Sequence, residues 1–216
     1  MKERGPRVRS PFHILFLFLF GFALVSRRAE AGSCDELVRS AKAHETAGET
    51  DVALRVYNDA VRLDPTCTNA WLGLGNLRAK TGDAAEAERV FDAALSHVPA
   101  LSDAIAGRAR SRWRLGRGPE AEEDMRQYVE RSAPNDPRAA LAGLVELASW
   151  YAAMNRPPAQ LACWRRVAAL AHGVDDALET RAKTTVRALS LVVGPADPVT
   201  HPPRKDLLRS VAALRN

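Results

Sequence analysis

The amino-acid sequence predicts an all-α protein in which one pair of antiparallel helices is repeated along the chain. Three kinds of residue recur at a fixed interval, namely a glycine, an alanine and a bulky apolar residue: Gly48, Gly82 and Gly116; Ala53, Ala87 and Ala121; Tyr57, Phe91 and Met125. Glycine tolerates the left-handed backbone that ends a helix, small alanine lets two helices approach closely, and large side chains fill the space between them. Because a chance helix pair would not keep these features in register, the sequence predicts a solenoid of stacked hairpins.

The clearest unit is the stretch 68–101, which carries apolar, small and helix-breaking residues at set positions: Trp71 at position 4, Leu74 and Gly75 at 7 and 8, Gly82 at 15, Ala87 at 20, Phe91 at 24, Ala94 at 27 and Pro99 at 32. This pattern resembles one complete tetratricopeptide repeat (TPR), a helix–turn–helix unit. The windows 34–67 and 102–135 match the same pattern. The resemblance implies a right-handed all-α TPR solenoid, with three clear helix hairpins within residues 32–135.

Each hairpin is predicted to consist of two helices joined by a short turn at the repeated glycine. The predicted helices cover residues 34–47 and 50–63, 69–81 and 83–97, and 102–115 and 119–131. An acidic residue early in each second helix (Asp51, Asp83 and Glu120) favours the positive end of the helix dipole. Pro119 suits the first turn of a helix.

Residues 136–193 are predicted to form a degenerate fourth repeat and a capping helix. Asn155 takes the place of Gly116 but follows it by more than one repeat interval, so the connection 133–137 is expected to carry an insertion. With this alignment, five residues fall on core positions of a repeat that runs from 141 to about 174: Leu144, Leu147, Ala148, Tyr151 and Trp164. Gln160 stands where the family pattern has a small residue, so this repeat departs from the family.

The remaining C-terminal segments are predicted from periodicity and proline content. Residues 174–193 predict a long amphipathic helix that covers the open end of the solenoid. Its apolar face is formed by four residues: Leu178, Ala182, Val186 and Leu189. Residues 194–203 contain four prolines and predict an extended linker, and 204–216 predict a last C-terminal helix.

Residues 1–31 have the layout of a secretory signal peptide. A basic opening precedes the apolar run 14–25, and Ala29-Glu30-Ala31 places small residues at the −3 and −1 positions of a cleavage site before Gly32. This apolar run is shorter than the roughly 20 residues that a membrane-spanning helix needs. We therefore expect an exported protein, periplasmic or secreted, that is free of the membrane after cleavage. The alternative is a retained anchor formed by residues 12–25.

Composition and motifs exclude several classes of function. The leader holds six basic and two acidic residues, so the net charge of the remaining chain falls from +5 to +1, too little for a nucleic-acid-binding surface. The sequence contains no phosphate-binding loop, no metalloprotease or nucleophile-elbow motif and no C-x-x-C pair. Its histidines lack the spacing of metal ligands. We therefore expect no catalysis, no cofactor and no metal site.

The cysteines indicate a disulfide. Cys34 opens the first helix of repeat one, and Cys67 follows the end of its second helix. Because antiparallel helices bring these two ends together, and exported proteins form disulfides, we expect a Cys34–Cys67 bridge. The alternative is two separate thiols at the ends of one repeat. Cys163 is expected to be a small core residue of the fourth repeat.

The resemblance also implies a binding surface, because the first helices of successive TPR units line a concave groove. Six residues are expected to face this groove: Lys42, Asn76, Lys80, Arg110, Trp113 and Arg114. The carboxylate-clamp variety of groove is not supported, since several of its positions hold Val38, Gly73, Asp103 and Gly107. A mildly basic groove with an aromatic residue suits an extended peptide of acidic character. Alternatively, the charges only solubilise a helix face, balanced by acidic neighbours.

The predicted function is an exported TPR scaffold or assembly factor that binds a protein or peptide partner in this groove without catalysis. The alternative is a non-catalytic TPR subunit of an envelope enzyme or secretion complex. An exposed apolar patch on the last helices would favour the subunit, and a polar, capped end would favour a free adaptor.

Overall fold

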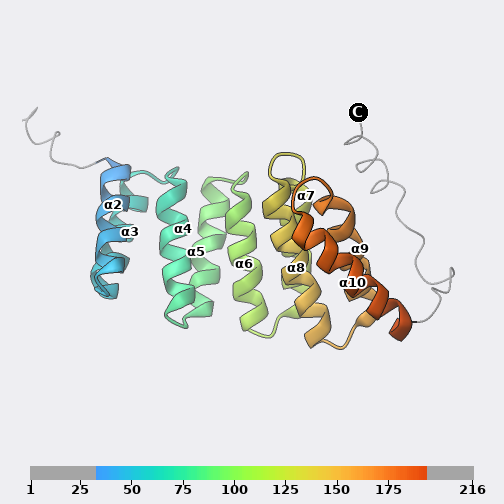
Figure 1. Ribbon diagram of the computed structural model, residues 1–216. Coiled ribbons are helices and arrows are strands. Elements are labelled where there is room, and N and C mark those ends of the chain that lie inside the picture. The colour runs from blue at the N-terminus through green and yellow to red at the C-terminus, as the bar shows by residue number, and fades with distance from the viewer. Residues whose placement is uncertain (1–32, 194–216) are drawn as a thin grey trace, which may run out of the picture. The chain divides into compact units, whose positions relative to one another are not determined.

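The computed structural model describes residues 33–193, which form helices α2 to α10 and contain no strand (Figure 1). Backbone contacts divide the chain into two compact units, with the boundary between Leu115 and Gly116. The predicted signal peptide (1–31), linker (194–203) and C-terminal helix (204–216) lie outside the described residues. Within the described part, no helix is both long enough and apolar enough to cross a membrane. The predicted all-α fold class is confirmed.

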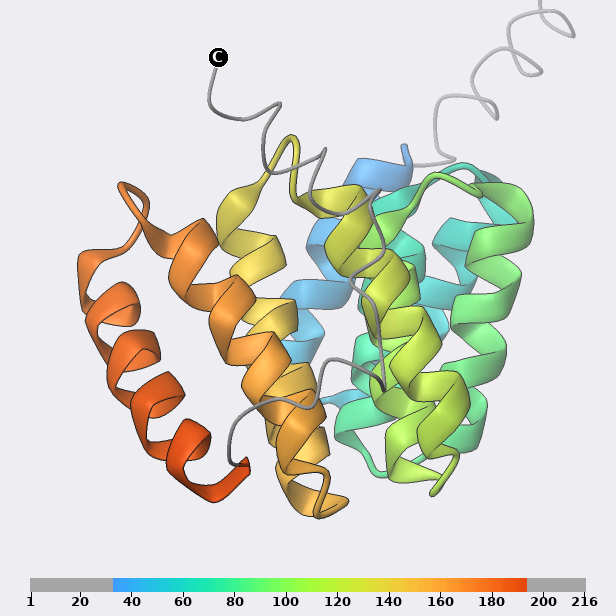
Figure 2. The same cartoon turned by 90° about the vertical axis from the view of Figure 1, so that its right-hand side faces the viewer.

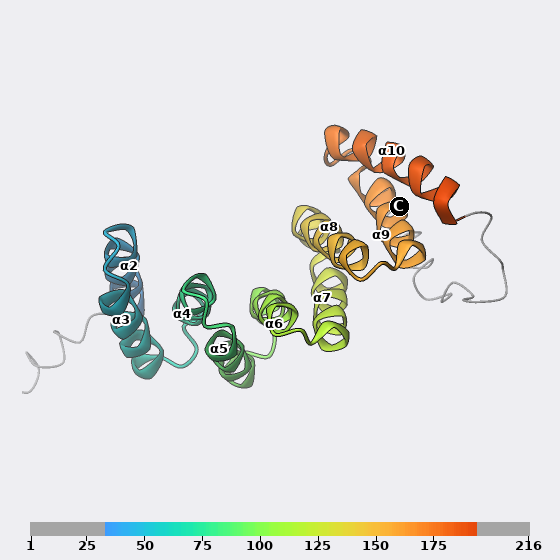
Figure 3. The ribbon, with the colours of Figure 1, turned by 90° about the horizontal axis from the view of Figure 1, so that it is seen from below.

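Unit 1 contains the first two hairpins and the first helix of the third. Its helices are α2 (Cys34–Thr46), α3 (Thr50–Leu63), α4 (Thr68–Lys80), α5 (Ala84–His97) and α6 (Ser102–Arg114). Every predicted helix of this region is present, and each end agrees with the prediction to within a single position. Helix α2 packs on α3, α4 on α5, and α5 on α6. Figure 3 shows α2, α4 and α6 on one side of this unit and α3 and α5 on the other.

Both complete hairpins of unit 1 turn at a glycine in the left-handed conformation, Gly48 with φ +79° and Gly82 with φ +89°. After the first of these glycines, the amide of Glu49 donates to the carbonyl of His44 at 2.9 Å. In the second turn, the amide of Asp83 donates to the carbonyl of Arg78 at 3.0 Å. These bonds occupy carbonyls that the helix end would otherwise leave open. A Cβ atom on either glycine would meet no neighbouring atom, so the backbone conformation alone requires glycine there.

The core of unit 1 is built around two aromatic rings that pack against glycines. A Cβ atom on Gly75 would lie 2.5 Å from the ring of Phe91, and one on Gly107 would lie 2.3 Å from the same ring. Phe91 is fully buried, so its ring is held between α4 and α6. Tyr57 packs in the same way on Gly73, where a Cβ atom would come within 2.3 Å. The ring of Tyr57 therefore packs on α4 and the ring of Phe91 packs on α6, in each case the first helix of the next repeat.

Ion pairs join α5 to α6 beside this core. Arg112 Nε lies 2.9 Å from Glu88 Oε1, and Arg108 Nη1 lies 2.7 Å from Asp92 Oδ1. The side chains of Arg112 and Glu88 are only 20% and 12% exposed, so this pair is well shielded from solvent. Shielding strengthens the attraction and makes loss of either partner costly.

The corresponding position between the first two repeats lacks such a pair. Arg78 stands exactly one repeat before Arg112, whereas Leu54 stands one repeat before Glu88. Among the residues that the structure describes, the buried Nε of Arg78 has no hydrogen-bond partner, and the guanidinium reaches only Asp83, at 4.0 Å. The leucine in place of a glutamate explains why this nitrogen is unsatisfied.

Unit 2 contains α7 (Gly118–Ser132), α8 (Pro137–Ala153), α9 (Pro157–Ala171) and α10 (Asp176–Val193). Helices α8 and α9 form the predicted fourth hairpin, and its five predicted core residues are all buried. Asn155 has φ +53°, and the amide of Arg156 donates to the carbonyl of Tyr151 at 2.8 Å. Asn155 thus ends the first helix as the glycines do in earlier repeats, because asparagine tolerates the left-handed region.

The predicted insertion lies in a different place from the one expected. Helix α8 begins at Pro137 and has 17 residues, whereas α2, α4 and α6 each have 13. Most of the extra residues therefore lengthen the helix rather than the connection before it. Asp136 caps this longer helix, its side chain accepting a hydrogen bond from the amide of Ala139 at 3.0 Å. The first helix of the fourth repeat thus starts earlier than residue 141.

A polar network joins α7 to the fourth hairpin. Glu122 pairs with Arg126 at 2.6 Å and with Arg156 at 2.8 Å, and Arg126 donates to the hydroxyl of Tyr151 at 3.1 Å. The guanidinium of Arg156 also lies 5.1 Å from the centre of the Tyr151 ring. Burial raises the pKa of Tyr151 to about 12, so its hydroxyl stays protonated. Glu122 stands one repeat after Glu88, and both carboxylates hold a contact to the next repeat.

Helix α10 packs on α9, as Figure 2 shows. Ala182 is fully buried, and Leu178, Val186 and Leu189 are half-buried on the same face. The predicted amphipathic capping helix is therefore confirmed, although it begins at Asp176 rather than at 174. Gly173, with φ +72°, makes the turn before it.

Candidate partner-binding face

The six predicted groove residues all lie on α2, α4 and α6. In unit 1, α2 is next to α4 and α4 is next to α6, and the three helices share one side (Figure 3). We call the exposed side of these three helices the first-helix face. It lies entirely within unit 1 and is carried by helices, which hold side chains more precisely than loops do.

One row of the first-helix face consists of Lys42, Asn76 and Arg110, which follow one another at the repeat interval and hold the same position on α2, α4 and α6. Lys42 and Asn76 are exposed, and Arg110 is half-buried. The side chains of Lys42 and Asn76 make no hydrogen bond or ion pair with any residue that the structure describes. They are available to an external ligand.

A second row, one helical turn further on, contains Lys80 and Arg114. Lys80 Nζ lies 3.4 Å from Glu45 Oε1 on α2, and Arg114 Nη1 donates to the carbonyl of Ala79 on α4 at 2.7 Å. Each cation therefore reaches back to the preceding repeat. The sequence analysis did not predict these contacts, and they leave Lys80 and Arg114 less free to bind an anion than Lys42 is.

Glu45, on α2, is the acidic residue that pairs with the second row. Besides Lys80, it accepts a hydrogen bond from the hydroxyl of Tyr57 at 3.5 Å. The pKa of Tyr57 is raised first by burial and then by the neighbouring Glu45 carboxylate. The Lys80 side chain is 70% exposed, so its pair with Glu45 contributes little to stability.

Trp113 adds an aromatic surface at the α6 end of the face. Its side chain is half-buried, beside Arg114 in the chain and one turn from Arg110. Three acidic residues were predicted as balancing charges: Asp35, Glu45 and Asp103. Asp35 and Asp103 lie in the first turns of α2 and α6, whereas Glu45 lies near the end of α2 and pairs with Lys80.

The residues that the structure describes were compared with the requirements of a metal site and of a nucleophile. Among the described residues, no group of three His, Cys, Asp or Glu side chains could hold a metal ion. Cys163 is buried in unit 2, and burial raises the pKa of its thiol to about 11, which makes it a poor nucleophile. The side chains of the first-helix face offer charge-assisted hydrogen bonds, as from Lys42, and an aromatic surface, from Trp113.

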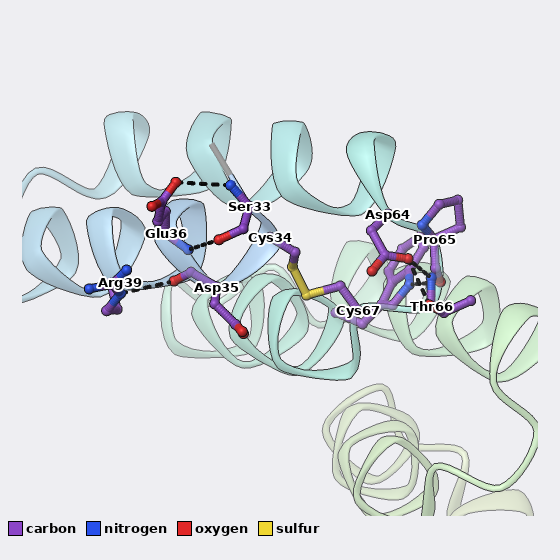
Figure 4. The surroundings of a disulfide bond; sticks show 10 residues. Ser33, Cys34, Asp35, Glu36, Arg39, Asp64, Pro65, Thr66 and Cys67 are labelled. Carbon is purple, nitrogen blue, oxygen red and sulfur yellow. Dashed lines mark hydrogen bonds between the residues drawn. A yellow bond between two sulfur atoms is a disulfide. The ribbon is translucent and has the colours of Figure 1, made fainter. Parts of the chain in front are cut away.

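The two predicted disulfide cysteines meet at one edge of unit 1 (Figure 4). Cys34 is the first residue of α2, and Cys67 immediately precedes α4. Their sulfur atoms are bonded, and their Cα atoms lie 6.5 Å apart, within the usual span of a disulfide. Ser33 caps the same end of α2: its hydroxyl accepts from the amide of Glu36, whose carboxylate accepts from the Ser33 amide at 2.9 Å.

Comparison with known proteins supports the class that the fold and the repeats define. Residues 38–104 match the family model described as tetratricopeptide repeat, and this segment covers most of the first two hairpins. Residues 38–104 therefore resemble tetratricopeptide repeats in sequence as well as in fold. Proteins of this family are typically non-catalytic scaffolds for protein–protein interaction. No curated protein matches the sequence.

Solved structures share the fold at low sequence identity. A Podosopora anserina protein with nearly identical TPR-like repeats has a TM-score of 0.59 at 16% identity, covering 84% of this chain and 94% of that one. MamA from Desulfovibrio magneticus RS-1, from residue 41 to its end, has a TM-score of 0.57 at 16% identity, covering 69% and 81%. Another MamA structure has a TM-score of 0.53 at 14% identity, covering 73% and 90%. These similarities concern the fold alone.

Proposed function

We propose that this protein is an exported scaffold or assembly factor that binds an extended segment of a protein partner across the first-helix face, without catalysis. One observation carries the proposal. Lys42, Asn76 and Arg110 stand in a row on three adjacent helices, and the first two have no polar side-chain partner within the described part. Polar groups held in a regular row on rigid elements suit an extended ligand.

The spacing of the helices sets the length of the ligand. Packed helices lie about 8–10 Å apart, so the row from α2 to α6 spans roughly 16–20 Å. An extended chain advances about 3.3 Å per residue, so roughly five or six residues cover this distance. Carboxylates near both ends of such a segment would meet Lys42 and Arg110, while the amide of Asn76 bonds the backbone between them.

Trp113 supplies the apolar contact that charges cannot. Exposed ion pairs contribute little affinity, whereas buried aromatic side chains commonly dominate an interface. We therefore expect the partner segment to carry an apolar side chain next to its carboxylate, placed against the indole. The preferred ligand in this proposal is an acidic segment with an apolar anchor.

The first test compares Trp113→Ala with Lys80→Ala. We expect Trp113→Ala to weaken partner binding about tenfold or more, because it removes the apolar anchor. Lys80→Ala should change binding less than about threefold, because Lys80 is exposed and already paired with Glu45. The measurement is crosslinked affinity capture from the native envelope, followed by a binding titration with the captured partner, with helicity checked by circular dichroism.

A charge reversal tests the electrostatic part of the same surface. Arg110→Glu should reduce capture through repulsion, and the loss should shrink as salt is raised. Arg55→Glu is the matched control, because Arg55 carries the same charge but lies exposed on α3, on the other side of unit 1. If both Trp113→Ala and Arg110→Glu leave capture unchanged, the partner does not use the first-helix face.

Export is the second part of the proposal. It is supported by the layout of residues 1–31 and by the pairing of Cys34 with Cys67, because disulfides persist in oxidising compartments. The intact mass of the exported protein should correspond to a chain that begins at Gly32. A mass that includes residues 1–31 would instead support an anchor formed by residues 12–25 and rule out a free periplasmic or secreted protein.

The alternative function, a non-catalytic subunit of an envelope enzyme or secretion complex, is favoured by one feature of α10. Leu191 is 84% exposed and Val192 is 72% exposed, and they are adjacent near the end of this helix. An obligate subunit would bury them against another protein. Co-purification of a stoichiometric complex that dissociates on Leu191→Asp would establish this alternative.

A further inference from the structure

Unit 2 contains a hollow between the start of α8 and the start of α10. It has a volume of about 570 Å³ and is lined by Arg138, Leu141 and Ala142 on one side and by Val174, Asp175 and Leu178 on the other. Most of these lining residues are apolar, so the burial of apolar side chains in the hollow would be energetically favourable. Of the lining residues on α8, Leu141 is buried and Ala142 is exposed.

The rim of this hollow carries opposite charges. Arg138 is exposed and makes no hydrogen bond or ion pair with any described residue. On the other side stand Asp175, which caps α10 by accepting from the amide of Leu178 at 2.9 Å, and the exposed Asp176. A ligand that fits must present apolar side chains flanked by basic residues toward α10 and an acidic residue toward α8.

The C-terminal segment of the same chain has this composition. Leu207, Leu208, Val211 and Leu214 recur at the spacing of one helix face. Around them stand one acidic residue, Asp206, and four basic residues: Arg204, Lys205, Arg209 and Arg215. The segment is therefore both amphipathic and complementary in charge to the rim.

The length of the chain allows this segment to return to the hollow. Helix α10 has 18 residues and is about 27 Å long, and the hollow lies at its first turn. Residues 194–203, which follow the last turn, can span about 33 Å when extended. The connection is therefore long enough to run back along the whole of α10.

We propose that residues 204–214 dock in this hollow as an intramolecular ligand. Leu207, Leu208 and Val211 enter the hollow, Asp206 faces Arg138, and the basic residues face Asp175 and Asp176. The docked tail thus covers a surface of the fourth hairpin that an outside ligand would otherwise use.

Trypsin cleavage of the full chain after Lys205 and Arg209 tests the proposal, because docking protects these bonds. Ala142→Trp fills the hollow and should speed cleavage about tenfold or more. Ala153→Trp is its control, because Ala153 is also exposed on α8 but lies outside the hollow. Leu208→Asp should likewise speed cleavage, whereas Ala213→Asp places the same charge on the opposite helix face and should not.

The outcomes distinguish docking of the chain's own C-terminal segment from docking of the same segment of a second copy. Equal cleavage rates in the unsubstituted chain, Ala142→Trp and Leu208→Asp would overturn the proposal. Protection that disappears on dilution would also overturn it, because the occupant would then be the tail of a second copy. Circular dichroism of each variant shows whether the described helices remain folded, so that faster cleavage is not misread as unfolding.

Discussion

Gly107→Ala is expected to destabilise unit 1 by about 3 kcal/mol, the upper part of the range for overpacking a core. The added Cβ would lie 2.3 Å from the ring of Phe91. The ring has little room to move, because its Cε1 and Cζ atoms also pack on Gly75 of α4 and the side chain is fully buried. The measurement is urea unfolding followed by far-ultraviolet circular dichroism, with the free energy of unfolding compared between variants.

A double-mutant cycle separates this clash from a general effect of losing glycine. Phe91→Leu creates space beside residue 107, so the cost of Gly107→Ala should fall when both changes are combined. Gly48→Ala is the contrast: no atom lies near its Cβ, and its cost of about 1 kcal/mol comes from the left-handed backbone. Phe91→Leu should leave that cost unchanged. Additive effects of Gly107→Ala and Phe91→Leu would contradict the packing of Phe91 between α4 and α6.

Loss of the Cys34–Cys67 bridge is expected to lower the free energy of unfolding of unit 1 by about 3–4 kcal/mol. In the chain-entropy model this is the effect of closing a loop between cysteines separated by 33 positions. Helix α2 should respond most, because Val38 and Ala41 are its only buried residues. The comparison is between the oxidised protein, the reduced protein and a Cys34→Ser/Cys67→Ser variant, each unfolded in urea.

Thiol counting tests the bridge itself. Alkylation of the unreduced, denatured protein should modify one cysteine per chain, Cys163, and a Cys163→Ala variant should show none. Modification of all the cysteines would mean that Cys34 and Cys67 are separate thiols. The stability difference between oxidised and reduced protein would then vanish as well.

The helices and the turns of the repeats could be predicted from the amino-acid sequence alone. Helix ends depend on local features, such as a glycine that adopts positive φ or a capping side chain, and these features recur with the period of the repeat. For this reason the boundaries in unit 1 agree closely with the prediction, and Asn155 could be recognised as a replacement for a glycine. The cysteine pairing followed from the same hairpin geometry.

The contacts between side chains of different repeats could not be predicted from the sequence and are seen only in the folded protein. The angle and depth at which helices pack place Phe91 on Gly107, pair Lys80 with Glu45 and direct Arg114 to the carbonyl of Ala79. These contacts join residues from different helices, and their geometry is not encoded in either local segment. The same holds for the earlier start of α8 and for the hollow beside α10, because both depend on how consecutive helices fill the space between them.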